Sequence, residues 1–317
     1  MKTFVASVLV VLIGGISYNT LHNHNDCAGF LPENDLQIPV GSIFVSGGGI
    51  TEAEFNATID RVEAVYTEIV EARGKTLDVR RLWTNNTVNA SAQQIGNTWR
   101  VNMYGGLARH PTIGVEAFTT VLCHEMGHHL GGAPKYGWSN SWASNEGQSD
   151  YYATTKCMRK LFTPEENAEY IGTVELDEYA RSLCDHVFNT DENRIANCYR
   201  SAVAGQDIAF LFQALRKMDK APQFNTPDAK VVSRTANAHP MPQCRLDTYF
   251  SGALCDVSHE EEVSDTDATV GVCNRIAEFN NPEEDQPEDE IDLPANIGTR
   301  PLCWFKPAKK RLPLAGL

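Results

Sequence analysis

The segment Gly114–Leu130 constrains the fold of this chain more than any other stretch. Its apolar residues recur on every side of a helix, at Val115, Phe118, Val121, Leu122, Met126 and Leu130. A helix that is apolar all round lies in the interior of a protein, and the pair of glycines that follows it ends it. We therefore expect a fold built around a buried central helix.

This buried helix carries the polar residues His124, Glu125 and His128 in the run HEMGH. Two residues four apart lie on one helix face, about 6 Å apart along the axis, so both imidazoles can reach one zinc ion. Glu125 can reach a water on that ion as a general base. Burying these groups is costly unless something satisfies them. Gly127, unfavourable in mid-helix, predicts close approach of another backbone. The alternative is a core helix that happens to be rich in histidine.

A third ligand is expected downstream. Pro134 stands ten residues after His124, where the metzincin pattern needs a histidine, so that subclass is excluded. Eighteen residues after His128, the run SNEGQSDYYA places Glu146 and Asp150 four residues apart. A second helix could present both carboxylates, with Glu146 completing the coordination and Asp150 accepting the free ring N–H of a liganding histidine.

The pair HEMGH … NEGQSD resembles the gluzincin metallopeptidases, in which thermolysin-like enzymes carry HExxH followed by NExxSD. The run AHPMPQCRLD at Ala238–Asp247 is similar to the His-Pro…Arg segment of the membrane-associated heat-shock and CAAX-type gluzincins, whose third-ligand motif is Glu-x-x-Ala-Asp. The close resemblance covers about Ala117–Ala153 and this short segment. Unlike the CAAX-type enzymes, the chain has no multiple membrane helices.

The resemblance implies that His124, His128 and Glu146 bind Zn²⁺, that Glu125 is the catalytic base and that Asp150 orients a ligand. The strand near 99–104 would be the family's edge strand, which pairs with an extended peptide.

The resemblance also implies a second donor that stabilises the oxyanion. His239 is the first candidate, followed by Arg245 and Tyr151; His239 could instead gate the zinc as a fourth ligand or have no role. The other histidines to which we assign a structural role are His110, His129, His186 and His259.

The remaining patterns predict an α+β fold. Thr51 and Glu54 are expected to form a capping box for a helix at Thr51–Ala72. Strands are expected at 41–45, 77–83 and 98–104. From Asn145 onward we expect a mostly helical chain, notably at 199–220 and after Pro240. We expect a zincin-like architecture, with a small mixed β-sheet and the active-site helix in the first lobe and an α-helical second lobe. The expected division is a signal peptide at 1–17, the zincin lobe at 18–135, the helical lobe at 136–256 and an acidic, cysteine-tethered appendage at 257–317.

The first residues indicate export. Lys2 precedes an apolar run, Phe4–Ile16, which is shorter than the roughly 20 residues of a membrane span, and Gly15 and Ser17 suit a cleavage site. An uncleaved anchor is the alternative. We expect a secreted or periplasmic protein with no transmembrane span after signal removal.

Nine cysteines fit an oxidising compartment. Near-neighbour pairing predicts the disulfides Cys184–Cys198, Cys244–Cys255 and Cys273–Cys303, and Cys123–Cys157 would then join the two ligand helices. The net charge of −14 argues against a nucleic-acid partner. Many of the acids lie between His259 and Asp292 without EF-hand spacing, which favours a solvated loop over a calcium site.

Together these features predict a zinc-dependent metalloendopeptidase that acts on peptides or unfolded proteins. Two alternatives remain open. One is a zinc-dependent hydrolase of cell-wall peptide amides; the other is a gated or chaperone-like envelope protein with a zinc site.

Overall fold

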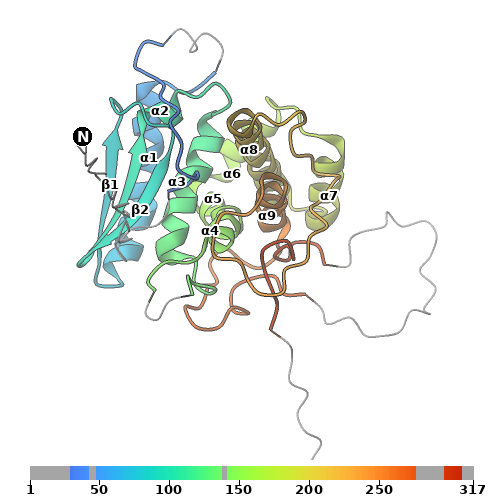
Figure 1. Cartoon of the computed structure of the whole chain (residues 1–317). Coiled ribbons are helices and arrows are strands. Elements are labelled where there is room, and N and C mark those ends of the chain that lie inside the picture. The colour runs from blue at the N-terminus through green and yellow to red at the C-terminus, as the bar shows by residue number, and fades with distance from the viewer. Residues whose placement is uncertain (1–28, 43–47, 138–140, 276–295, 309–317) are drawn as a thin grey trace, which may run out of the picture.

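The structure, a computed structural model, describes residues 29–42, 48–137, 141–275 and 296–308 (Figure 1). The predicted signal peptide at 1–17 lies outside the described residues. The first elements in chain order are α1 (Glu52–Glu71), β1 (Thr76–Leu82), β2 (Ala90–Ile95), β3 (Thr98–Tyr104), α2 (Gly105–Ala108) and α3 (Val115–Leu130). They are followed by α4 (Glu146–Tyr152), the π-helical turn η2 (Ala153–Cys157), α5 (Met158–Leu161), α6 (Pro164–Ile171), α7 (Glu178–Phe188), α8 (Glu192–Arg216) and α9 (Pro242–Leu254).

The predicted α+β class is confirmed, and the sheet is three-stranded in the order β1-β3-β2. β1 is parallel to β3, and β2 is antiparallel to it. The expectation that the strand at 99–104 is an edge strand is therefore wrong, because β3 lies in the centre. The edge next to it is β2, which the sequence patterns did not predict. The strand expected at 41–45 falls mostly outside the described residues, and Gly41 lies in a turn.

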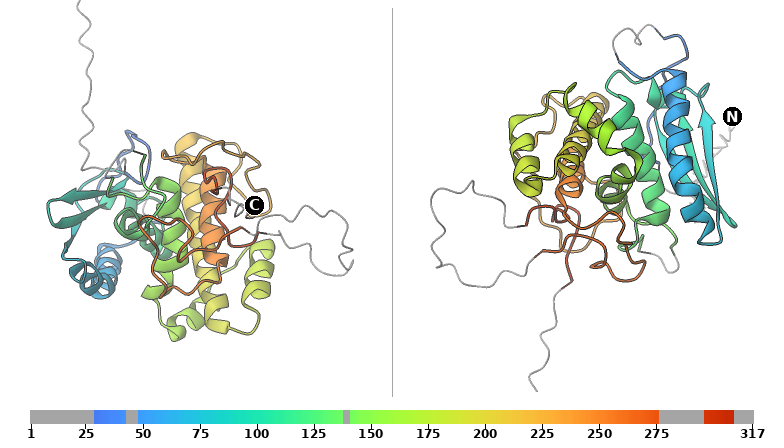
Figure 2. Two further views of the ribbon diagram at one scale, coloured as in Figure 1. Left: turned by 90° about the horizontal axis from the view of Figure 1, so that it is seen from below. Right: turned by 180° about the vertical axis from the view of Figure 1, so that it is seen from behind.

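Two helices cover one face of the sheet. α1 packs against β1, α3 packs against β2 and β3, and the two helices contact each other (Figures 1 and 2). The expected capping box is present at the start of α1, where Thr51 and Glu54 bond reciprocally. Val101 and Met103 are buried on the helix side, whereas Asn102 bonds to Ser91 on the other side. This alternation is that of a sheet with one covered face.

The second half of the chain is helical, as predicted. α8 packs against α3, α6, α7 and α9, and α9 also packs against α4. Figure 2 shows this helical layer on the far side of α3 from the sheet. The main core joins the two halves, because Phe118 and Val121 of α3 belong to one cluster with Ile208 and Leu211 of α8. α3 is thus buried from both sides, as its apolar surface predicts.

Four disulfides join the described residues. Those between Cys123 and Cys157 and between Cys184 and Cys198 confirm the prediction. The predicted pairs Cys244–Cys255 and Cys273–Cys303 are wrong, since the bonds are Cys244–Cys303 and Cys255–Cys273. The segment 296–308 returns to the start of α9, so Cys303 lies beside Cys244 although the two are 59 residues apart. Cys27 is outside the described residues.

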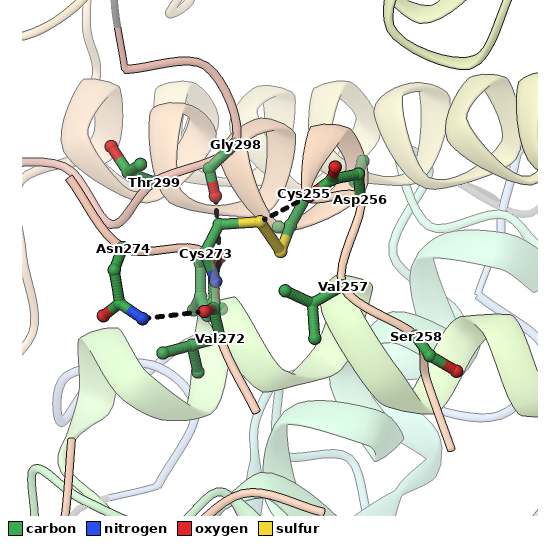
Figure 3. Close-up of a disulfide and its surroundings, with 12 residues drawn as sticks. Cys255, Asp256, Val257, Ser258, Val272, Cys273, Asn274, Gly298 and Thr299 are labelled. Atoms are coloured by element: carbon green, nitrogen blue, oxygen red, sulfur yellow. Dashed lines mark hydrogen bonds between the residues drawn. A yellow bond between two sulfur atoms is a disulfide. The ribbon is translucent and has the colours of Figure 1, made fainter. Parts of the chain in front are cut away.

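The described residues after α9, 255–275 and 296–308, are irregular but anchored. Figure 3 shows the Cys255–Cys273 bond between the end of α9 and the following loop, with the sulfur of Cys273 close to Asp256. Trp304 is fully buried and lies so close to Gly147 that a Cβ there would stand 2.2 Å from its ring. Residues 296–308 therefore support α4 directly.

No helix within the described residues is long and apolar enough to cross a membrane. The four disulfides fit an oxidising, extracellular compartment.

Replacing Cys123 and Cys157 by alanine is expected to lower the free energy of unfolding by about 4 kcal/mol, because the bond closes a loop of 34 residues in the unfolded chain. The matched control replaces Cys184 and Cys198, which are only 14 residues apart, and should cost about 3 kcal/mol. Urea denaturation of both variants checks the order. A larger loss for the shorter loop would contradict the chain-entropy explanation.

Candidate metal centre

Two helices that pack closely present the predicted ligands. His124 and His128 lie on α3, and Glu146 is the first residue of α4. Asn145 caps α4 by accepting a hydrogen bond from the Gln148 backbone N–H. A Cβ at Gly127 would stand 3.0 Å from Cα of Ser149. The expectation of a close backbone approach at Gly127 is confirmed, and the helix brought close is the one that carries Glu146.

The three ligand side chains converge on one point. One ligand atom from each of His124, His128 and Glu146 lies within 4.8 Å of the others, and all three residues are fully buried. Nε2 of His124 is 3.3 Å from Oε2 of Glu146, and Nε2 of His128 is 3.8 Å from Oε1. The two Nε2 atoms and Oε2 find no hydrogen-bond partner among the described residues. Buried polar atoms need partners, so this group fits a metal ion.

The other nitrogen of each imidazole is held in place. Nδ1 of His124 donates to Oδ1 of Asp150 at 2.7 Å, as predicted from the spacing. Nδ1 of His128 lies 2.9 Å from the carbonyl oxygen of Ser144 and 3.1 Å from Oγ of Ser149. A hydrogen bond from Nδ1–H leaves the lone pair on Nε2, which is the tautomer that a metal requires.

A buried arginine lies behind Asp150. Arg245 on α9 donates from Nε and Nη2 to the two carboxylate oxygens at 2.8 and 2.7 Å, and Tyr249 also donates to Oδ1. Burial alone would raise the pKa of Asp150, but Arg245 and His124 together hold it well below its ordinary value. Asp150 is therefore a carboxylate that keeps His124 oriented.

Electrostatics prepare the ligands for a cation. Burial lowers the pKa of His128 to about 4, so its imidazole is neutral. Burial opposes ionisation of Glu146, but His128 and His124 outweigh it and lower the pKa of Glu146 to about 2. Burial likewise works against protonation of His124, yet Asp150 raises its pKa to about 9. A metal at Nε2 of His124 would therefore take the place of a proton.

Glu125 follows His124 on α3 and interacts electrostatically with both His124 and Glu146. Neither of its oxygens has a hydrogen-bond partner among the described residues, and the side chain is fully buried. Burial raises the pKa of Glu125 to about 8. A cation held by the neighbouring ligands would favour the carboxylate form. This arrangement suits a group that takes up and releases a proton next to the metal.

Two further side chains border the site. His239 lies with Nε2 3.2 Å from Oε2 of Glu146 and 2.8 Å from the carbonyl oxygen of Gly29. The hydroxyl of Tyr136 donates to Oε1 of Glu146 at 2.5 Å, and its ring stacks near His128. We did not predict Tyr136 from the sequence. It lies between the two motifs without a pattern of its own.

The structure does not bring the other two oxyanion candidates to the ligands. Arg245 is engaged with Asp150, and the hydroxyl of Tyr151 donates to the carbonyl oxygen of Gly298, in the C-terminal segment. Of the remaining histidines, His129 is buried and its ring stacks with those of Trp99 and Trp142. This position agrees with a structural role.

The comparisons with known proteins give no match: no protein-family model, no curated protein and no solved structure matches this chain. The chemistry of the site therefore stands on its own geometry, which is that of two imidazoles and a carboxylate able to hold a metal ion beside a buried, unpaired glutamate.

Proposed function

We propose that this protein is an exported zinc metalloendopeptidase with a zincin-like fold, of the gluzincin type. The observation that carries the proposal is the convergence of the unpartnered atoms of His124, His128 and Glu146 beside Glu125. Two imidazoles and one carboxylate are a ligand set of catalytic zinc, and three protein ligands leave one position open. A purely structural zinc site has no use for Glu125.

Zinc held by these residues would supply a Lewis acid that lowers the pKa of a water molecule to about 7. Glu125 would accept the proton of the attacking water and deliver it to the leaving amine. Asp150, fixed by Arg245, keeps His124 in the liganding tautomer. Nε2 of His239 lies 3.2 Å from Oε2 of Glu146, and we assign to His239 the stabilisation of the developing oxyanion. The hydroxyl of Tyr136 donates to Oε1 of Glu146, so we assign to Tyr136 the orientation of that carboxylate.

The outer edge of β2 gives a peptide somewhere to bind. The carbonyl oxygen of Ala90 accepts a bond from the backbone N–H of Phe30, so it points away from β3. Backbone groups two residues apart in a strand point to the same side, which places those of Ala92 and Gln94 on that outer edge as well. β2 contacts α3, so an extended peptide paired with this edge would run beside the helix that carries both histidines.

The first test measures metal content and proteolysis together. We expect one zinc per purified chain by elemental analysis, hydrolysis of unfolded casein, loss of hydrolysis with a chelator and recovery with added zinc. His128→Ala removes a ligand and should lose the metal and the activity. Its matched control is His186→Ala, on α7, which should retain both. A purified chain that binds no zinc would refute the proposal.

The close contact of His239 with Glu146 favours one second candidate, a gated zinc protein without protease activity. In that case the wild type would hold one zinc and cleave nothing, and His239→Ala would be needed to open the site. If instead His239 stabilises the oxyanion, His239→Ala should lower kcat on a peptide substrate about 100-fold with little change in KM, as measured by steady-state kinetics.

A further inference from the structure

We propose that Gly29 and Phe30 occupy the groove in which a peptide substrate would lie, so that the chain's own N-terminal segment holds the site closed. This inference concerns the regulation of the same site and rests on the proposed function. It starts from the burial of the ligands: His124, Glu125, His128 and Glu146 have no exposed surface. A peptide cannot reach the metal until something that covers these residues moves.

The segment enters the groove along the sheet edge. Residues 30–38 run antiparallel to residues 86–90, through bonds from Phe30 N–H to the Ala90 carbonyl at 2.9 Å and from Ile38 N–H to the Asn86 carbonyl at 2.8 Å. Ala90 is the first residue of β2, whose outer edge a substrate would use. Phe30 therefore takes up the beginning of the edge where an added strand would pair.

Two side chains of the site hold consecutive carbonyl groups of the segment. Nε2 of His239 lies 2.8 Å from the carbonyl oxygen of Gly29, and Nη1 of Arg245 donates to that of Phe30 at 2.7 Å. The same nitrogen of His239 is 3.2 Å from the ligand oxygen of Glu146. Gly29 thus sits one side chain away from the metal ligands, and hydrogen bonds from the site hold both its carbonyl group and that of Phe30, although the chain bends at Phe30.

The ring of Phe30 completes the contact. It is fully buried, meets the ring of His124 edge to face at 5.2 Å and lies under the guanidinium of Arg245 at 4.5 Å. Because the segment is part of the same chain, it competes with substrate at a high effective concentration without needing strong contacts. His239 cannot donate to an oxyanion while its Nε2 donates to Gly29. Displacing Gly29 would free this nitrogen and the edge of β2 together.

The first experiment weakens the close contact between Gly29 and the start of β2. A Cβ at Gly29 would stand 2.7 Å from the carbonyl oxygen of Ala90, so Gly29→Val should push the segment away from β2. We expect kcat/KM for a fluorogenic peptide to rise 5- to 30-fold, since a shift of 1–2 kcal/mol in the closed state has this effect. The matched control is Gly172→Val, where the nearest atom is 3.4 Å from the added Cβ, and it should leave kcat/KM unchanged.

If the segment has only a structural role, Gly29→Val should not raise kcat/KM. Gly29→Val would then lower kcat/KM or leave it unchanged with zinc retained, and either result overturns the inference. If the wild type and both variants bind zinc but none hydrolyses peptide, the proposed function fails as well.

The second measurement uses the unmodified protein and does not depend on a variant that folds. The amide of Phe30 is protected by its bond to Ala90. We expect a leucine-based peptide hydroxamate, bound to the zinc-loaded protein, to accelerate hydrogen exchange at this amide at least tenfold. Unchanged protection with the hydroxamate bound shows that the groove is elsewhere and overturns the inference. A zinc-loaded protein that does not bind the hydroxamate contradicts the proposed function.

Discussion

Glu125→Gln should abolish peptide hydrolysis while leaving the metal in place. Glu125 is next to His124 in sequence but is not part of the convergent group of His124, His128 and Glu146, so one zinc per chain is expected in the variant. A positioned general base contributes about 10²–10⁴-fold to a rate, and glutamine cannot accept the proton of the attacking water. We therefore expect kcat/KM to fall by at least 100-fold. Elemental analysis and steady-state kinetics on the same preparation check both parts.

The control is a glutamate-to-glutamine change on the same helix. Glu116 lies in the first turn of α3 and pairs with Arg200 at 3.5 Å, about 13 Å along the axis from Glu125. Glu116→Gln should retain at least half of the activity. Equal losses in the two variants would mean that α3 is sensitive to any lost charge. Full activity of Glu125→Gln would assign the base to another residue and remove the main argument for catalysis.

The elements predicted correctly are those with a local cause. The helix from Glu52 to Glu71 follows from its capping box and its apolar stripe, and α3 follows from a run of apolar residues that ends in two glycines. The candidate metal site also has local causes. Two histidines lie four residues apart on one helix, and two carboxylates lie four residues apart on the next. Close packing of these helices at Gly127 then brings the two pairs together.

The errors concern features that are set by distant parts of the chain. β2 reads ASAQQI, in which the buried residues Ala90 and Ala92 are too small to give a strand pattern. The place of β3 in the centre of the sheet depends on β2 folding back beside it. The pairing of Cys244 with Cys303 depends on residues 296–308 packing under α4 with Trp304. Near-neighbour pairing of cysteines contains none of this information.

The same reason explains why two neighbours of the site could not be predicted. Tyr136 and Gly29 reach Glu146 and His239 from segments without a repeating pattern. Only the packing of the complete chain brings them there. A motif can thus reveal candidate metal ligands, whereas the residues that pack around them emerge only in three dimensions.

Arg245→Leu should destabilise the protein by about 3–5 kcal/mol, because it leaves the buried carboxylate of Asp150 without its main counter-charge. The side chains of Arg245 and Asp150 are 2% and 0% exposed, and two hydrogen bonds join them. The loss should appear in urea denaturation of the metal-free protein at pH 7. Since the pKa of Asp150 is lowered in the folded state, the contribution of the pair is present above pH 4 and is lost as the pH falls. The difference between wild type and variant should shrink accordingly.

A double variant separates the stability lost with the ion pair from the stability lost with the packing of the Arg245 side chain. Adding Asp150→Asn to Arg245→Leu removes the uncompensated charge, so the double variant should be more stable than Arg245→Leu alone. Arg245→Lys keeps the charge but loses the two-point contact and should fall between wild type and Arg245→Leu. Two results would contradict this explanation: a loss of less than about 1 kcal/mol of unfolding free energy in Arg245→Leu, or a double variant whose loss is only the sum of the two single losses. Either would mean that the carboxylate of Asp150 does not depend on Arg245. The orientation of His124, and with it the geometry of the metal ligands, would then need another support.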